Sequence, residues 1–417
     1  MHETTRRYVC RWAFCAFCVL PTLLVVAWSV YRLTPADVRS REVQWSAWSG
    51  LGVTIGRVSY PRPGIMLLDD VQLADPKTAV PIVRIKRLQS ARRDGALVLL
   101  AREPEILSSR IGRLWELLDE RILRGQTFKG KTAELIAGRL TLHTARGPQT
   151  LIDVRGRIEP APVGLEATLD FRLAGVDSEQ PARLRVVRDR QARPPLTRLE
   201  IHSGPTPLPC TLLSTQFAAL GRLGARCWFD GSVWATRAAD RWEADVTGRL
   251  RGIDLDRLVS DQFPHTLSGS AEIVLRRAHV RGGRLVRASG RLSAGSGHVS
   301  RSLLTSAAES LRLSISDGVR PRGQPSLAYR QLALAFTVDE GGLSIRGQCA
   351  GAPAGTVLTD ANGRLLGEPP SQPLPVAGLV RMLVPDGDFL VPAMHETDAL
   401  LRLLPMPPAG GDRSVRR

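Results

Sequence analysis

The chain of 417 residues contains little lysine and few aromatic residues, and these scarcities limit its partners. Lysine occurs only at positions 77, 86, 129 and 131, so the net charge of +17 comes almost entirely from arginine. Aromatic residues make up 5% of the chain, which is poor for a surface that stacks bases, and we expect no nucleic-acid partner. Acidic lipid headgroups or anionic polymers suit such a basic surface better, although genome composition explains the arginine content equally well.

Motifs for catalysis and metal binding are also missing. The seven histidines include no His-Glu-x-x-His pair, and no Gly-x-Ser-x-Gly elbow is present. Residues 125–132 match the phosphate-loop pattern, but that loop needs a strand before it and a helix after it. Here a helix is expected before residue 125 and a strand at 139–144, so we interpret the match, including Lys131, as a coincidence. We predict no enzymatic activity, no cofactor and no metal site.

One hydrophobic run stands out. Residues 12–31 carry no charged side chain, and Arg6, Arg7 and Arg11 precede them. About 20 apolar residues are enough to cross a bilayer as a helix, and basic flanks favour the cytoplasmic side. A cleaved signal peptide is the alternative, but its apolar core is usually about 7–15 residues and ends in small residues. We predict a retained, single-pass transmembrane helix with most of the chain on the far side.

Three cysteines lie beyond this run, at positions 210, 227 and 349. In an oxidising compartment, Cys210 and Cys227 are candidates for a disulfide that closes a short loop. Cys349 then remains unpaired. None of the three has Cys-x-x-Cys spacing, which argues against zinc or thiol-redox chemistry in the exported part.

Alternation with a period of two dominates the sequence after the hydrophobic run. In residues 165–173, 242–250 and 332–338, apolar side chains alternate with mostly polar or charged ones. Such alternation places one face of a strand on apolar contacts and the other in water. Strands of this kind usually form antiparallel sheets joined by short turns, and the glycine pairs at 282–283 and 341–342 fit those turns.

Helices are expected to be few. An amphipathic helix is predicted over residues 103–123, and shorter ones around 211–223, 300–311, 376–384 and 396–404. We expect five segments along the chain: a cytoplasmic tag (1–11), a transmembrane helix (12–32), an N-terminal β region with the amphipathic helix (33–130), a longer β-rich region (131–368) and a proline-rich tail (369–417).

Two parts of this pattern resemble the AsmA-like proteins of the Gram-negative envelope. Residues 51–58, followed by a Pro-Gly turn and residues 68–75, are similar to the strand pair that opens the family's domain. Residues 290–300 read Gly-Arg-Leu-Ser-Ala-Gly-Ser-Gly-His-Val-Ser and precede a predicted helix. That is similar to the family's C-terminal module, and the resemblance covers the architecture over most of residues 10–350.

The resemblance implies a mainly β fold: an elongated, curved, antiparallel and groove-like sheet behind one transmembrane helix. It implies an inner-membrane anchor, a periplasmic bulk and no catalytic residues. An open sheet with one apolar face would shield acyl chains from water, whereas a closed sheet would have an ordinary core, and the sequence leaves both open. The residues expected to line a lipid groove are Leu165, Ala167, Leu169, Phe171, Leu173, Trp242, Ala244, Val246, Leu332, Leu334, Phe336 and Val338.

Three functions are compatible with this pattern, and we rank them. The first is an envelope protein that binds or transfers lipid, with phospholipid as its partner, or assists outer-membrane assembly. The second is a scaffold for envelope or secretion machinery that binds a protein partner and no lipid. The third, an enzyme that uses Lys131 as an ATPase or acts as a hydrolase, is the least favoured.

Overall fold

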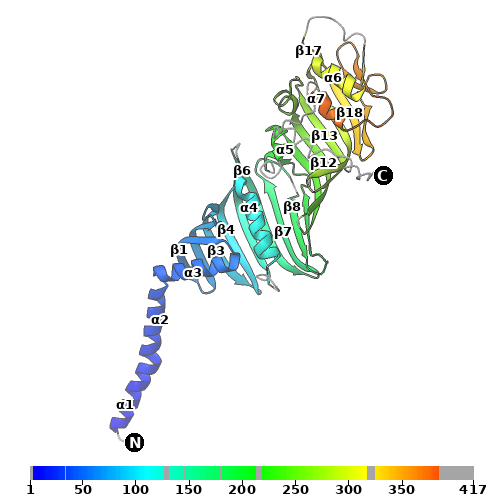
Figure 1. Cartoon of the computed structure of the whole chain (residues 1–417). Coiled ribbons are helices and arrows are strands. Elements are labelled where there is room, and N and C mark those ends of the chain that lie inside the picture. Colours follow the sequence, from blue (N-terminus) through cyan, green and yellow to red (C-terminus); the bar gives the residue numbers. More distant parts are fainter. Residues whose placement is uncertain are drawn as a thin grey trace. The chain divides into compact units, whose positions relative to one another are not determined.

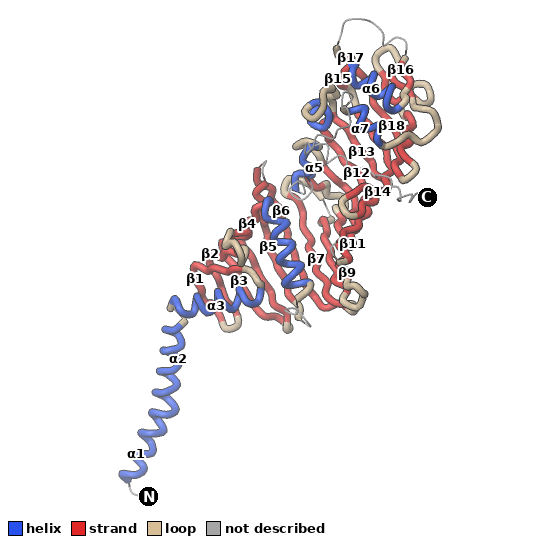
Figure 2. Tube along the Cα trace, in the orientation of Figure 1, coloured by secondary structure: helices blue, strands red, loops and turns tan. Residues whose placement is uncertain are grey.

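The computed structural model describes residues 3–32, 34–125, 131–144, 147–178, 180–212, 218–239, 241–316 and 325–384. The contacts divide the chain into two compact units, one with residues 1–143 and 148–160 and the other with residues 144–147 and 161–417. Both are built mainly from strands with a few helices, so the predicted fold class is confirmed (Figures 1 and 2). The sequence analysis placed a boundary between residues 130 and 131, whereas the contacts divide the chain between residues 143 and 161.

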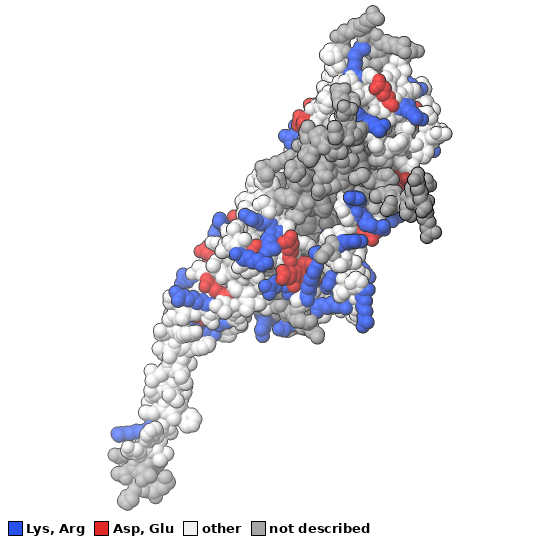
Figure 3. Space-filling model, in the orientation of Figure 1, with Lys and Arg blue, Asp and Glu red and all other residues white. Residues whose placement is uncertain are grey.

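The first unit begins with one long helix, made of α1 (Glu3–Phe14), a π-helical turn (Cys15–Val19) and α2 (Leu20–Tyr31). Its stretch Tyr8–Tyr31 is 24 residues long, has a mean hydropathy of 2.2 and buries no residue in the protein. The π-helical turn ends two residues before Pro21, whose ring crowds the preceding turn and which has no N–H to donate. The helix is long and apolar enough to cross a membrane, and Figure 3 shows it almost without charge between its ends.

A helix and an antiparallel meander follow the long helix. The elements are α3 (Pro35–Ser49), β1 (Gly52–Arg62), β2 (Ile65–Ala74), β3 (Pro81–Arg93), β4 (Ala96–Leu107), α4 (Ile111–Leu118), β5 (Ala133–Thr144) and β6 (Gly147–Ala161). Strands β1 to β4 pair antiparallel in chain order. Strand β5 pairs parallel to β4, so the sheet is mixed and not purely antiparallel as expected. A parallel pair needs a crossover connection, and α4 lies in the segment that supplies it.

Cross-strand apolar pairs form the core of this unit. One row joins neighbours on five strands, in the order Val58, Leu68, Leu88, Ala101 and Ala137. All five are buried. In Figure 1, helix α4 lies in front of the first unit's strands, and its Leu117 is buried as well. The apolar residues at alternate positions of these strands therefore pack together on one face of the sheet in this unit.

The helix predicted over residues 103–123 is shorter than expected. Strand β4 continues to Leu107, and α4 begins at Ile111 and is followed by a π-helical turn (Asp119–Leu123). Pro104 lies in β4 opposite Ile85, and Glu103 before it adopts a positive φ of 51°. The residue before a proline is disfavoured in the helical region, and the pairing of β4 continues past Pro104 to Ile106, so Pro104 lies within a strand and does not begin a helix.

The second unit contains most of the strands. They are β7 (Gly164–Leu173), β8 (Ala182–Asp189), β9 (Leu196–His202), β10 (Leu208–Pro209), β11 (Trp228–Ala238), β12 (Arg241–Asp254), β13 (Ser270–Arg281), β14 (Arg284–Ala294), β15 (Gly297–Ser300), β16 (Ser314–Ile315), β17 (Ser326–Tyr329), β18 (Gln331–Asp339), β19 (Gly342–Gly347), β20 (Thr356–Thr359) and β21 (Arg364–Gly367). Its helices are α5 (Ala218–Arg222), α6 (Arg301–Leu311) and α7 (Ala377–Leu383).

The pairings of this unit are antiparallel. The order of neighbours is β7, β8, β9, β11, β12, β13, β14, β18 and β19. Gly282 and Gly283 join β13 to β14 with φ values of 58° and 78°, which is the left-handed geometry of a two-residue hairpin turn. The three rows of alternation in the sequence fall on β7, β12 and β18, so these strand predictions are confirmed.

Two helices predicted near the C-terminal end of this unit are confirmed. Helix α6 begins after Ser300, whose side chain accepts a hydrogen bond from the N–H of Leu303 and caps the helix. Helix α7 lies within residues 376–384, where a short helix was expected. The helix predicted at 396–404 lies outside the described residues. Around 211–223 only the short helix α5 and a 3-10 turn (Cys210–Leu212) are described.

An ion pair joins α4 to the end of β2 in the first unit. The Nε atom of Arg113 donates to Oδ2 of the buried Asp75 at 2.7 Å, and the N–H of Lys77 donates to Oδ1. These bonds, above all the one from Arg113, lower the pKa of Asp75 to about 2. The pKa of Asp75 in the folded protein lies below the ordinary value of about 3.9. The ion pair therefore contributes its full stabilisation of the folded protein above about pH 4.

We therefore expect the attachment of α4 to weaken as the pH falls from about 4 towards 2, and Asp75→Asn to remove that pH dependence. Hydrogen exchange of the α4 amides measures this. In Asp75→Asn, exchange should already be faster at neutral pH and should change little on acidification. The control is Asp94→Asn, because Asp94 is exposed and pairs with its exposed neighbour Arg93 at 3.8 Å, away from α4. Equal exchange in Asp75→Asn and the parent protein would contradict this assignment.

Candidate functional site

The most extensive feature of the second unit is a row of apolar side chains that crosses nine paired strands. Its members are Leu169, Leu184, Ile201, Val233, Val246, Ala278, Ala288, Val338 and Leu343. Each is the direct cross-strand partner of the next, and directly opposed residues share a face of the sheet. We call this set the apolar row. The same face carries a second line of neighbours: Ala167, Val186, Leu199, Ala235, Ala244 and Val280.

The environment of the apolar row changes along its length. From β13 to β19 its members are buried, because α6 and α7 cover them and contribute Leu303, Leu304 and Leu379 to one cluster. From β7 to β12 its members, such as Leu169 and Val233, are only half-buried. The row is therefore an ordinary core at one end and a less covered apolar face at the other.

The predicted lining residues divide between these two environments. Val338 is buried in the cluster under α6 and α7, and Leu332, Leu334 and Phe336 pack against it. Leu165 and Leu173 are buried in β7. The others are half-buried: Ala167, Leu169, Phe171, Trp242, Ala244 and Val246. The part of the row on β7 to β12 is thus the candidate site, and the residues of β18 belong to the covered part.

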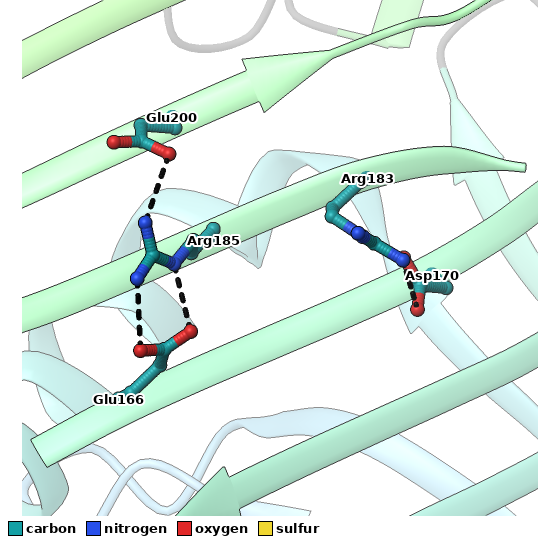
Figure 4. A network of polar contacts seen from close by, with 5 residues as sticks. All are labelled: Glu166, Asp170, Arg183, Arg185 and Glu200. Atoms are coloured by element: carbon teal, nitrogen blue, oxygen red, sulfur yellow. Dashed lines mark hydrogen bonds and ion pairs between the residues drawn. The ribbon is translucent and has the colours of Figure 1, made fainter. Parts of the chain in front are cut away.

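The opposite face of the same strands is polar and held by ion pairs between strands (Figure 4). Arg185 on β8 lies between Glu166 on β7 and Glu200 on β9, with Nε 2.7 Å from Glu166 and Nη1 3.4 Å from Glu200. Arg183 makes a second pair with Asp170, at 2.6 Å. Exposed pairs of this kind contribute about 0–1 kcal/mol each, so their main effect is on strand register and less on stability.

The same arrangement continues on β12 and β13. Arg281 Nη2 lies 2.7 Å from Glu243, and Arg277 Nε lies 2.9 Å from Asp245. Hydrogen bonds from Arg281 hold the pKa of Glu243 below its ordinary value, as those from Arg185 do for Glu166. The carboxylates are therefore ionised partners of the arginines at neutral pH, and this geometry provides no protonated acid for catalysis.

The disulfide expected between Cys210 and Cys227 is present, and both cysteines are buried. They belong to a cluster with Phe229 and Ile253, and the N–H of Cys210 also donates to the carbonyl of Cys227. Cys349 is free and buried. The disulfide thus ties the segment after β10 to the start of β11.

Cys15 and Cys18 have a Cys-x-x-Cys spacing that the sequence analysis did not consider. They lie on the π-helical turn of the long apolar helix and are exposed in the protein. In an apolar environment, such as the one that a membrane-spanning helix would have, cysteine behaves as a small apolar residue. The spacing therefore does not point to a metal site here.

The phosphate-loop match is placed as the sequence analysis expected. Residues 126–130 lie outside the described residues, but α4 and its π-helical turn precede them and strand β5 follows at Ala133. That is the reverse of the strand-loop-helix order that phosphate binding requires. Lys131 is exposed at the start of this strand.

Sequence reasoning missed the members of the apolar row on β9 and β11. Leu199, Ile201, Val233 and Ala235 alternate with polar or aromatic residues over only three or four positions. Trp234 faces the opposite side and is 47% exposed, so the alternation in hydrophobicity is interrupted there. A period-two search that scored short segments would have found them.

Comparison with known proteins adds no assignment. The chain matches no family model, no curated protein and no solved structure.

Because the apolar face is covered at one end and half-buried at the other, shortening a leucine to alanine should lower the free energy of unfolding by different amounts at the two ends. Leu304→Ala, which opens a cavity under α6, should lower the free energy of unfolding by about 2–5 kcal/mol. Leu169→Ala should cost only about 1 kcal/mol, because a half-buried side chain gives up roughly half of its transfer free energy. Urea unfolding of the two variants measures the difference. Equal losses would show that the face is as tightly covered at β7 as it is under α6.

Proposed function

We propose that this chain is an AsmA-like, membrane-anchored envelope protein that binds or passes phospholipid along the apolar face of its second unit. The N-terminal helix is its single inner-membrane anchor, with the N-terminal tag in the cytoplasm and the bulk of the chain in the periplasm. The observation that carries this proposal is the apolar row, which is continuous in register and half-buried on five of its strands.

The dimensions of the half-buried part suit an acyl chain. Five neighbouring strands about 4.8 Å apart span roughly 19 Å, which is comparable with one leaflet of a hydrocarbon core about 30 Å thick. Each methylene that leaves water for this face contributes about 0.8 kcal/mol at full burial. The ion-paired opposite face remains in water, so lipid has one face on which to bind.

A second candidate function has its own support. Helices α6 and α7 cover the row from β13 to β19, which is what a scaffold with a closed core requires. In that case the protein assists envelope or secretion machinery through a protein partner and carries no lipid. The two functions differ in whether lipid contacts the half-buried strands.

Lipid content of the purified protein separates them. We expect the full chain, extracted in a nonionic detergent, to retain phospholipid, and Leu169→Glu to lower the bound amount at least about tenfold, because a carboxylate on the apolar row must be desolvated by an acyl chain. Mass spectrometry of extracted lipid gives the amount per chain.

The matched control is Thr168→Glu, which places the same charge one residue earlier, on the ion-paired face opposite Arg185. It should retain the lipid of the parent protein. If both variants lose lipid equally, or if the parent retains none after gentle extraction, the lipid function fails and the scaffold function stands.

A further inference from the structure

A hollow of about 760 Å³ lies in the first unit, beside the end of the apolar helix. Its wall combines α3, the turn between β1 and β2, and the ends of β3 and β4. Pockets that hold small ligands usually measure roughly 300–1,000 Å³, so the hollow is of suitable size. It is separate from the apolar row, which belongs to the second unit.

The charge of this hollow is of one sign. Four arginines line it, namely Arg32, Arg41, Arg62 and Arg92, and no carboxylate is among the described residues of its lining. Arg41 has a partner in Asp37, at 3.5 Å. Within the described part of the chain, the other three have no carboxylate partner. A wall with three unneutralised guanidinium groups attracts an anion.

Arg32 is the residue that points most directly to a ligand. Its guanidinium carbon lies 4.9 Å from the ring centre of Trp28 and 4.2 Å from that of Tyr60, so the two rings hold the group in place. Its Nε atom is buried and has no hydrogen-bond partner among the described residues. A buried donor left without an acceptor costs free energy. Arg32 as a whole is only half-buried and lines the hollow, so an anion there would meet its positive charge.

The position of the hollow indicates where the anion comes from. Arg32 immediately follows the span that ends at Tyr31. Trp45 and Trp48 on α3 line the hollow with their rings 5.4 Å apart, and tryptophan suits the headgroup layer of a bilayer. Ile65 and Leu97 add apolar wall. Arginine forks match phosphate oxygens, and the apolar wall suits the adjoining glycerol and chain ends.

We propose that this hollow binds the phosphate of an anionic phospholipid through Arg32, Arg62 and Arg92. The inference rests on the membrane anchoring in the proposed function and is independent of lipid binding on the apolar row. The site selects lipid by headgroup charge at the membrane surface, whereas the apolar row has no charge with which to select.

The test is a native mass-spectrometry titration of the detergent-solubilised full chain with phosphatidylglycerol and with phosphatidylcholine of the same acyl chains. We expect phosphatidylglycerol to bind at least about tenfold more tightly. Arg62→Gln/Arg92→Gln should reduce its affinity to that of phosphatidylcholine. Both arginines are exposed, so the fold should survive their substitution. The control Arg93→Gln/Arg102→Gln removes two exposed charges of the same unit outside the hollow and should bind as the parent does.

Equal affinity for the two lipids, or equal losses in the two double variants, would overturn the proposal. Displacement of phosphatidylglycerol by inorganic phosphate at comparable concentration would also overturn it, because the hollow would then be a site for free phosphate. The Leu169→Glu variant separates this inference from the apolar row. Loss of total lipid with the headgroup preference kept supports both sites, whereas loss of the preference in Leu169→Glu would overturn the assignment to the hollow.

Discussion

The pairing register of strands β7 to β19 is the constraint on which the rest of the second unit depends. Side chains alternate between faces with a period of two, so a slip of one residue would move Leu169 to the charged face and Thr168 to the apolar one. The ion pairs on the charged face oppose such a slip, because Arg185 reaches both Glu166 and Glu200 only in the observed register. Weak surface pairs thus maintain the continuity of the apolar row.

That continuity gives one surface two different roles. Where α6 and α7 lie on the row, the side chains of Ala278, Val338 and Leu343 form a closed core that stabilises the unit. On β7 to β12 the same kind of side chain is half-buried, and Val233 and Val246 pack against the cluster around the Cys210–Cys227 disulfide. The stabilising face of the second unit therefore continues beyond the covering helices, and the proposed lipid binding would use this same face. In the first unit, the headgroup site proposed for the arginine-lined hollow would add a charge-based contact that the apolar row lacks.

Much of the local structure followed from the sequence. Alternation located β7, β12 and β18, charge and hydropathy located the long helix, and the disulfide between Cys210 and Cys227 followed from compartment and spacing. Pairing between distant strands did not follow, because alternation states that a strand has two faces and not which strand lies beside it. For the same reason, nothing local indicated that α6 would cover Val338. The helix predicted from residue 103 begins later, at Ile111, because Pro104 was interpreted as a helix start and instead lies within β4.

The arginine-lined hollow was beyond sequence reasoning for a related reason. Arg32, Arg62 and Arg92 come from three separate elements, and each is unremarkable in a chain rich in arginine. Only the fold brings them to one wall and leaves the Nε atom of Arg32 buried without an acceptor among the residues that the structure describes. The net charge of the chain can be read from its composition. Which charged side chains line the hollow depends on how the first unit folds.

The most direct test of the account is lipid contact at alternate positions of β11. A photoreactive phenylalanine analogue is placed at Val233, on the apolar row, and in a second protein at Trp234, on the opposite face. After irradiation in membranes, we expect phospholipid adducts at position 233 and few at position 234. Adducts at neither position, or equal yields at both, would contradict the claim that the apolar face of this sheet carries lipid.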